Sequence, residues 1–131
     1  MLEKFDKLQD ILLVSCGAIF GANIRFIIYK EFEKFNLSKY YSILIINTLA
    51  SFLLGLFLSM ITHISSYDLY YQLVLFFSIG LLGSLSTLSS LLYDLFDLFI
   101  QYKFFRALKL LFLSLSLGLI SLAFGSFLGN Q

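Results

Sequence analysis

Four long runs of apolar residues, separated by short polar segments, dominate the pattern of this 131-residue chain. We place them at residues 11–29, 41–63, 70–93 and 105–128. A helix needs about 20 apolar residues to cross the hydrocarbon core of a bilayer. The tyrosines fall at the ends of these runs, where an amphipathic ring suits the headgroup region. The pattern predicts an all-α membrane protein, a single integral domain of residues 1–131 with four transmembrane helices.

The third run contains a segment rich in glycine and hydroxyl side chains, residues 80–90, with the sequence GLLGSLSTLSS. Such a segment weakens its own helix, and an unpaired backbone N–H or C=O in hydrocarbon costs several kcal/mol. It must therefore be buried in protein or line a polar cavity. We expect the third helix to be broken in mid-membrane and the break to form an ion site.

Composition supports a membrane setting and excludes several classes of function. Hydrophobic residues make up 60% of the chain and charged residues 13%, against roughly a quarter in soluble domains. The net charge is +1, and no basic cluster is interleaved with aromatics, so the sequence lacks the pattern typical of nucleic-acid binding. The one cysteine, Cys16, has no internal disulfide partner and no ligand neighbours for zinc.

Basic residues predict an orientation. If four spans cross, the amino-terminal side carries two cations, Lys4 and Lys7, whereas the opposite side carries six: Lys30, Lys34, Lys39, Lys103, Arg106 and Lys109. Cytoplasmic loops carry an excess of lysine and arginine. We therefore expect the six-cation side to be cytoplasmic and both termini to lie outside the cytoplasm.

Three of the runs have a narrow face of small or polar residues. These residues recur at spacings of three or four: Gly17 and Gly21; Asn47, Ser51, Gly55 and Ser59; Ser114, Gly118, Ser121 and Gly125. Small residues allow helices to approach closely in lipid, so we interpret the glycines as packing positions. Asn47 is different, because a carboxamide at membrane depth needs hydrogen-bond partners. We favour a pore or site role for it.

Acidic residues and histidine are absent from the middle of the spans. No Asp, Glu or His lies deep in any run, which disfavours proton-coupled transport, and no catalytic set can be assembled, so we expect no enzyme. We interpret Asp94 and Asp97 as solvated charges at the end of the third span. Arg25 either extends to the interface or attracts anions in an aqueous vestibule, and both readings stay open.

Three motifs carry a resemblance over nearly the whole chain: Gly21-Ala22-x-x-Arg25, then Asn47 followed by Ser51-Phe52-x-x-Gly55, then Gly80-x-x-Gly83-x-x-Ser86-Thr87-x-Ser89-Ser90. In type and order they resemble the small four-helix fluoride channels of the Fluc or CrcB family. The resemblance implies an antiparallel dimer with two pores, a structural sodium ion at its centre, and passive export of fluoride across a bacterial inner membrane.

The resemblance also assigns residues. It implies that backbone carbonyls of Gly83 and Ser86 hold the sodium ion. Of the two readings of Arg25, we keep the vestibule as the candidate role. The fluoride path is expected along Asn47, Ser51, Thr87, Leu88, Ser89, Leu91 and Ser114. A small, tightly hydrated anion needs donors there to replace its lost water.

One departure from the family pattern is important. The family has phenylalanines where this chain has Leu88 and Leu91, and leucine lacks the electropositive ring edge that an anion can approach. A pore lined by these two leucines should conduct poorly or not at all. Together with the charge bias, this favours a heterodimer with an oppositely oriented homologue over a homodimer.

Two alternatives remain. The chain could be a non-conducting partner or scaffold subunit, in which Asn47 would only join two helices. A small multidrug-type exporter is less favoured, because it would need a glutamate in the first span, and none is present.

Overall fold

The computed structural model describes residues 2–36, 38–62 and 66–131, with the backbone alone for residues 2–5. The elements, in chain order, are α1 (Leu2–Lys34), α2 (Lys39–Ile61), α3 (Tyr67–Leu73), the π-helix η1 (Val74–Leu82), α4 (Gly83–Leu85), α5 (Leu88–Ile100) and α6 (Phe104–Gly129). The described residues contain no strand, and the predicted all-α fold is confirmed.

Four helical segments are long and apolar enough to cross a membrane, as the sequence predicts. The third of them is composite and consists of α3, η1, α4 and α5. It continues to Ile100, well beyond our expected end at residue 93. Residue 63, where we expected the second span to end, lies outside the described residues.

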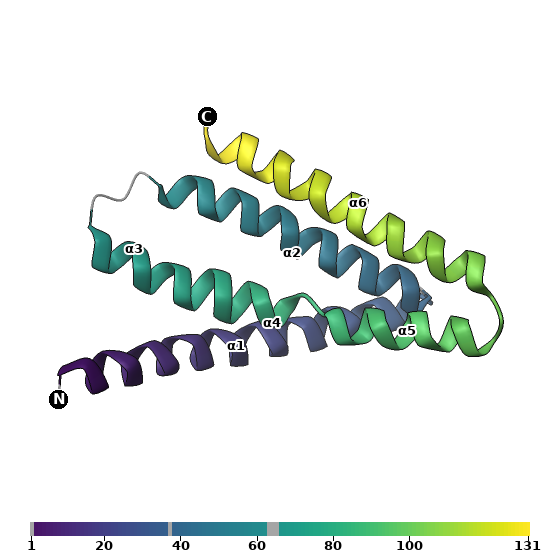
Figure 1. Cartoon of the computed structure of the whole chain (residues 1–131), viewed down its shortest axis with the longest axis horizontal. Helices are drawn as coiled ribbons and strands as arrows, with labels where there is room; N and C mark the ends of the chain where they lie inside the picture. Colours follow the sequence, from purple (N-terminus) through teal and green to yellow (C-terminus); the bar gives the residue numbers. More distant parts are fainter. Residues whose placement is uncertain (1, 37, 63–65) are drawn as a thin grey trace.

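The chain runs back and forth along one direction (Figure 1). Both termini lie toward one end of the molecule, together with the start of α3, while α2 and α6 begin at the other end. The six cations that set the predicted orientation therefore belong to elements that meet at the second end. This matches four crossings.

α2 and α6 pair along most of their length. A Cβ atom added to Gly55 would overlap the carbonyl oxygen of Leu122, and one added to Gly125 would overlap that of Phe52. The pair is also joined by Ser59, whose Oγ donates to the carbonyl oxygen of Ser126 at 2.8 Å. The close approach depends on these glycines, which confirms their interpretation as packing positions.

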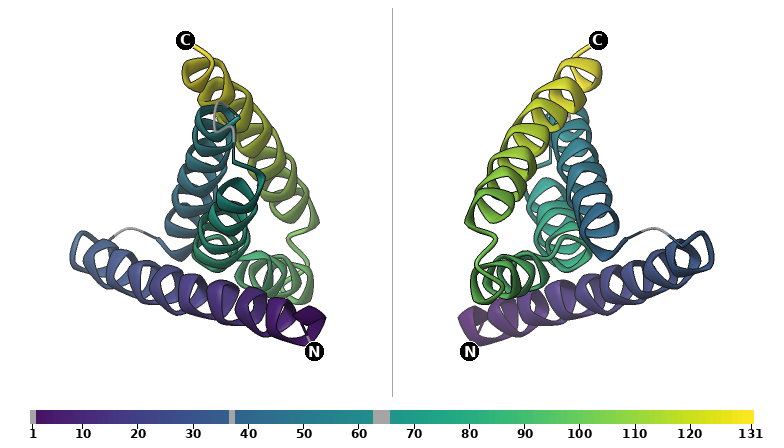
Figure 2. Two further views of the ribbon diagram at one scale, coloured as in Figure 1. Left: turned by 90° about the vertical axis from the view of Figure 1, so that its left-hand side faces the viewer. Right: turned by 90° about the vertical axis from the view of Figure 1, so that its right-hand side faces the viewer.

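α1 packs instead against η1 and α4, and it crosses the other helices at a steep angle (Figure 2). Gly17 and Gly21 lie at this contact, where an added Cβ would overlap the carbonyl oxygens of Phe76 and Leu81. On the η1 side of the contact lies Gly80, where an added Cβ would meet the backbone of Val14 and Gly17. The glycines of the first span are thus packing residues as well.

The interior is small for a chain of this hydrophobicity. One buried cluster joins Ile43 on α2 with Leu91, Leu95 and Leu98 on α5 and Ala107 on α6. Most large apolar side chains of α1 and α6 are exposed instead. An exposed apolar surface of this extent marks contact with lipid or with another protein.

Candidate functional site

The third span is interrupted at two residues. Helical geometry ends at Leu85 and resumes at Leu88. Ser86 has φ −70° and ψ 154°, and Thr87 has φ −142° and ψ 108°, both extended. The predicted break is therefore confirmed, but it lies on the C-terminal side of the glycines, which themselves stay helical.

Asn47 of α2 supports the interruption. Its Oδ1 accepts a hydrogen bond from the backbone N–H of Thr87 at 2.8 Å, and its Nδ2 donates to the backbone carbonyl of Thr87 at 3.2 Å. One carboxamide thus satisfies both backbone polar groups of a residue that has left the helix. An unsatisfied group of this kind is costly in an apolar environment.

Thr87 also caps the helix that follows. The residue is buried, with 3% of its surface exposed. The Oγ1 atom accepts from the backbone N–H of Ser90 at 3.2 Å and donates to Ser90 Oγ at 2.9 Å. This is the N-cap arrangement in which a hydroxyl serves an otherwise unpaired helix N–H. Two polar side chains therefore hold the break in one conformation.

The break opens on a groove of about 330 Å³ between α2, α5 and α6. We call it the Asn47 groove. It is lined by Asn47, Ser51, Leu54, Ser86, Thr87, Leu88, Leu91, Ser114, Leu115, Gly118, Leu119 and Leu122. It brings together six of the seven residues predicted for a fluoride path. The seventh, Ser89, is exposed and does not line the groove.

The groove has few free hydrogen-bond donors. Within the described part of the chain, the hydroxyls of Ser51 and Ser114 have no hydrogen-bond partner. A carboxamide has two N–H bonds, and Asn47 uses one of them on Thr87. The Thr87 hydroxyl is already committed to Ser90. The Ser86 hydroxyl donates to the Gly83 carbonyl at 3.4 Å. The side-chain donors left for a passing solute are therefore Ser51, Ser114 and the second N–H of Asn47.

Over residues 12–126 the sequence matches a family described as "CrcB-like protein, Camphor Resistance (CrcB)". The chain belongs to the CrcB family. A protein of Prochlorococcus marinus (strain NATL2A) named "Fluoride-specific ion channel FluC 2" is 59% identical over 124 residues, which cover 95% of this chain and 100% of that protein. The resemblance inferred from the three motifs is confirmed.

This CrcB chain has no aromatic side chain among the residues of the Asn47 groove. Leu88 and Leu91, which the resemblance places where the family has two phenylalanines, both line it. Leu88 is 68% exposed at the surface of the subunit, whereas Leu91 is 5% exposed and packs in the core. The two positions therefore differ in how freely they can accept a ring.

The break also withdraws helical donors from two carbonyls. In a continuous helix the N–H of Thr87 would bond the Gly83 carbonyl, and the N–H of Ser90 would bond the Ser86 carbonyl. Here the first N–H donates to Asn47 and the second to the Thr87 side chain. These are the two carbonyls that the family resemblance assigns to sodium.

A second cavity of about 100 Å³ adjoins these carbonyls. Gly83 and Ser86 line it, as do Ser51 of α2 and Ser78, whose buried Oγ has no hydrogen-bond partner among the described residues. Ser51 and Ser86 line the Asn47 groove as well. The two hollows are therefore neighbours along the interruption.

Arg25 lies apart from both hollows. It is half-buried on α1, four residues before Tyr29, and lines neither the groove nor the smaller cavity. Its expected place in a vestibule stays a prediction.

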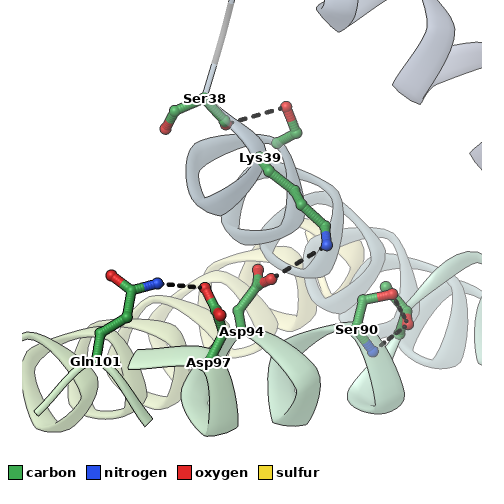
Figure 3. A network of polar contacts seen from close by, with 8 residues as sticks. Ser38, Lys39, Ser90, Asp94, Asp97 and Gln101 are labelled. Carbon is green, nitrogen blue, oxygen red and sulfur yellow. Dashed lines mark hydrogen bonds and ion pairs between the residues drawn. The ribbon is translucent and has the colours of Figure 1, made fainter. Parts of the chain in front are cut away.

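Asp94 corrects our sequence interpretation. We expected a solvated charge at the end of the span, but Asp94 is 2% exposed. Its Oδ1 lies 3.4 Å from Lys39 Nζ (Figure 3), and its Oδ2 has no hydrogen-bond partner in the part of the chain that the structure describes. The reason is that α5 runs on to Ile100, so Asp94 lies within the helix, on its buried face with Leu91 and Leu98.

Sequence reasoning missed two further features. The Lys39–Asp94 pair joins residues far apart in the chain, and no sequence motif predicts it. Gly118, which we grouped with the packing glycines, lines the Asn47 groove, where an added Cβ would lie 3.5 Å from Ser51 Oγ. Its four-residue spacing from Ser114 was the only signal.

Proposed function

We propose that this chain is a subunit of a passive, fluoride-selective channel that exports cytoplasmic fluoride and lowers its toxicity. The observation that carries the proposal is the interrupted third span, which Asn47 holds in an extended conformation beside a groove with three free side-chain donors. The relative's name supplies the ion, because that protein is called a fluoride-specific channel. A small anion sheds water only where donors replace it, and Ser51, Ser114 and Asn47 can do so.

The channel works as an antiparallel dimer in the bacterial inner membrane, with both termini of this chain outside the cytoplasm. The excess of cations at one end supports a fixed orientation. A fixed orientation requires an oppositely oriented homologue for an antiparallel pair. The absence of aromatic residues from the Asn47 groove supports such a partner, which would supply the missing ring edges, and the number in the relative's name fits paired genes.

A sodium ion at the centre of the dimer is part of the proposal. Carbonyl oxygens suit a hard cation, and the Gly83 and Ser86 carbonyls have lost their helical donors. Gly83 is exposed, and a Cβ added there would meet no atom closer than 3.7 Å, so packing within the subunit does not require glycine. We expect Gly83→Ala to leave the subunit folded and to abolish a sodium-dependent rise in thermal stability, measured against potassium.

The test is fluoride efflux from liposomes, followed with a fluoride electrode. We expect no efflux from this chain alone and clear efflux when it is reconstituted with the second CrcB homologue of its organism. Efflux from the chain alone would overturn the heterodimer and keep the channel. No efflux from either preparation would favour the second candidate, a non-conducting partner or scaffold subunit, which the aromatic-free groove supports.

A gain-of-function variant sharpens this choice. Leu88 is exposed in the subunit, so Leu88→Phe introduces a ring without repacking the core. We expect it to raise efflux of the complex or of the chain alone. Leu92→Phe, at an exposed position of α5 that does not line the groove, is the matched control and should change nothing.

A further inference from the structure

A hollow of about 380 Å³ lies where α2 begins, α5 ends and α6 begins. We call it the basic mouth. It is lined by Ser38, Tyr40, Tyr41, Leu44, Leu98, Gln101, Lys103, Arg106, Lys109, Leu110 and Leu113. Three cations thus share one hollow with hydroxyl and amide groups, at the end of the molecule where a headgroup layer would lie.

The cations of the basic mouth are not neutralised by the protein. Arg106 and Lys109 pair with no carboxylate in the described part of the chain, and Lys103 Nζ donates to Gln101 Oε1 at 2.5 Å. The two nearby carboxylates have other partners, since Asp94 pairs with Lys39 and Asp97 accepts from Gln101 Nε2 at 2.9 Å (Figure 3). The hollow is therefore ready to bind an anionic group.

An apolar furrow of about 410 Å³ continues from the mouth between α2 and α6. The two hollows share Leu44, and the furrow is lined by Leu44, Ile45, Thr48, Leu49, Phe52, Leu117, Ser121 and Phe124. From Tyr41 to Phe52 the axis of α2 rises by roughly 16 Å. This is about half of the hydrocarbon core, the depth of one leaflet.

The mouth and furrow do not belong to the Asn47 groove. On α6 they use Leu110, Leu113, Leu117, Ser121 and Phe124, which recur at three or four residues and form one stripe. The Asn47 groove uses a different stripe, with Ser114, Gly118 and Leu122. Residues three or four apart share a helix face, so the two sites lie on different faces of α6.

We propose that the basic mouth and the furrow together bind an anionic phospholipid. The phosphate lies at Arg106 and Lys109, with Tyr41 and Gln101 near the rest of the headgroup, and one acyl chain occupies the furrow. The cationic end selects an anionic headgroup, while the leaflet-deep apolar extension selects a lipid over a soluble phosphate. This inference is independent of the proposed fluoride conduction.

The test uses the absence of tryptophan from the chain. Tyr41→Trp places one fluorophore at the mouth, and Phe35→Trp places one at an exposed position at the end of α1. Each protein is reconstituted in phosphatidylcholine vesicles that contain brominated phosphatidylglycerol or, at equal mole fraction, brominated phosphatidylcholine. We expect Trp fluorescence at position 41 to be quenched with a roughly tenfold preference for the anionic lipid, and at position 35 with little preference.

Charge variants in the Tyr41→Trp background test whether the cations of the basic mouth cause the preference for anionic lipid. Arg106→Gln with Lys109→Gln should remove most of the preference, whereas Lys30→Gln with Lys34→Gln, two exposed cations outside the mouth, should retain it. Equal quenching by both lipids would overturn the proposal. So would a preference that survives the Arg106/Lys109 change, a preference abolished by millimolar inorganic phosphate, or no quenching by either lipid, which would indicate a protein-covered face.

Discussion

Asn47 and Thr87 lie 40 residues apart in the chain and exchange two hydrogen bonds, one through each end of the Asn47 carboxamide. The pair joins α2 to the interruption in the third span. It also leaves one Asn47 N–H directed to no backbone group, in a groove with two free serine hydroxyls. Structural support and solute contact are therefore properties of the same side chain.

Asn47→Leu should destabilise the protein and abolish fluoride efflux. The change leaves the N–H and C=O of Thr87 unpaired at membrane depth, a loss of about 1–3 kcal/mol for each unsatisfied group. The measurements are the thermal midpoint in detergent and efflux from liposomes of the complex. Asn23→Leu is the matched control, because Asn23 is exposed on α1 and donates only to the Ile19 carbonyl of its own helix. An Asn47→Leu protein with normal efflux would contradict this account.

Ser51→Ala and Ser114→Ala should each lower fluoride efflux without lowering stability. Both serines line the groove, and neither hydroxyl has a hydrogen-bond partner among the described residues, so their removal costs the fold no hydrogen bond. A hydrogen bond to a charged group contributes about 1.5–3 kcal/mol, so each change should slow efflux roughly tenfold or more. Ser116→Ala serves as control, since Ser116 is exposed on α6 and lines no part of the groove. A fall in thermal midpoint equal to that of Asn47→Leu would argue for a purely structural role.

Gly125→Ala should lower the stability of the protein, whereas Gly118→Ala should lower its conduction. The first places a methyl group against the Phe52 carbonyl and should force α2 and α6 apart, at a loss of about 1–3 kcal/mol. The second has room, with Ser51 Oγ at 3.5 Å, and should keep the fold while it narrows the groove. Thermal midpoints and fluoride efflux, measured on both variants, distinguish a glycine needed for helix packing from a glycine that lines the fluoride path. Equal destabilisation by the two changes would be inconsistent with this assignment.

Lys39→Gln should destabilise the protein, and adding Asp94→Asn should restore part of the loss. The single change leaves a buried carboxylate without its cation. Because the Lys39 side chain is 60% exposed, solvent screening reduces the effect of a fully buried pair to about 1–2 kcal/mol. A double-mutant cycle on thermal unfolding measures the coupling. Strictly additive losses would show that the two charges do not interact.

Much of the fold could be predicted from the sequence because membrane crossing imposes a simple length and polarity rule. Apolar runs of the right length gave the four spans, and small residues such as Gly21 and Gly125 gave the helix contacts. The ends were less certain, because polar residues such as Asp94 can continue a helix when a distant lysine pairs with them. The nine-residue π-helix had no local signal in the sequence.

The site was predicted in part. The hydroxyl-rich segment gave the break, and the motif order gave most residues of the groove. The position of the break depends on a hydrogen bond to Asn47 of another helix and on the Thr87 cap. The first is a tertiary contact, which the local sequence does not reveal. Glycines suggested the break, yet Gly80 is used for contact with α1. Pattern cannot distinguish these two uses of a glycine.

The interruption between Leu85 and Leu88 also has an electrostatic consequence. A helical stretch ends there with its carbonyls pointing forward, and α5 begins there with its N–H groups pointing back. Aligned peptide dipoles give a helix about half a negative charge at its carboxyl end and half a positive charge at its amino end. The two sides of this two-residue gap therefore carry partial charges of opposite sign, negative at Leu85 and positive at Leu88. No ionised side chain is needed to produce them.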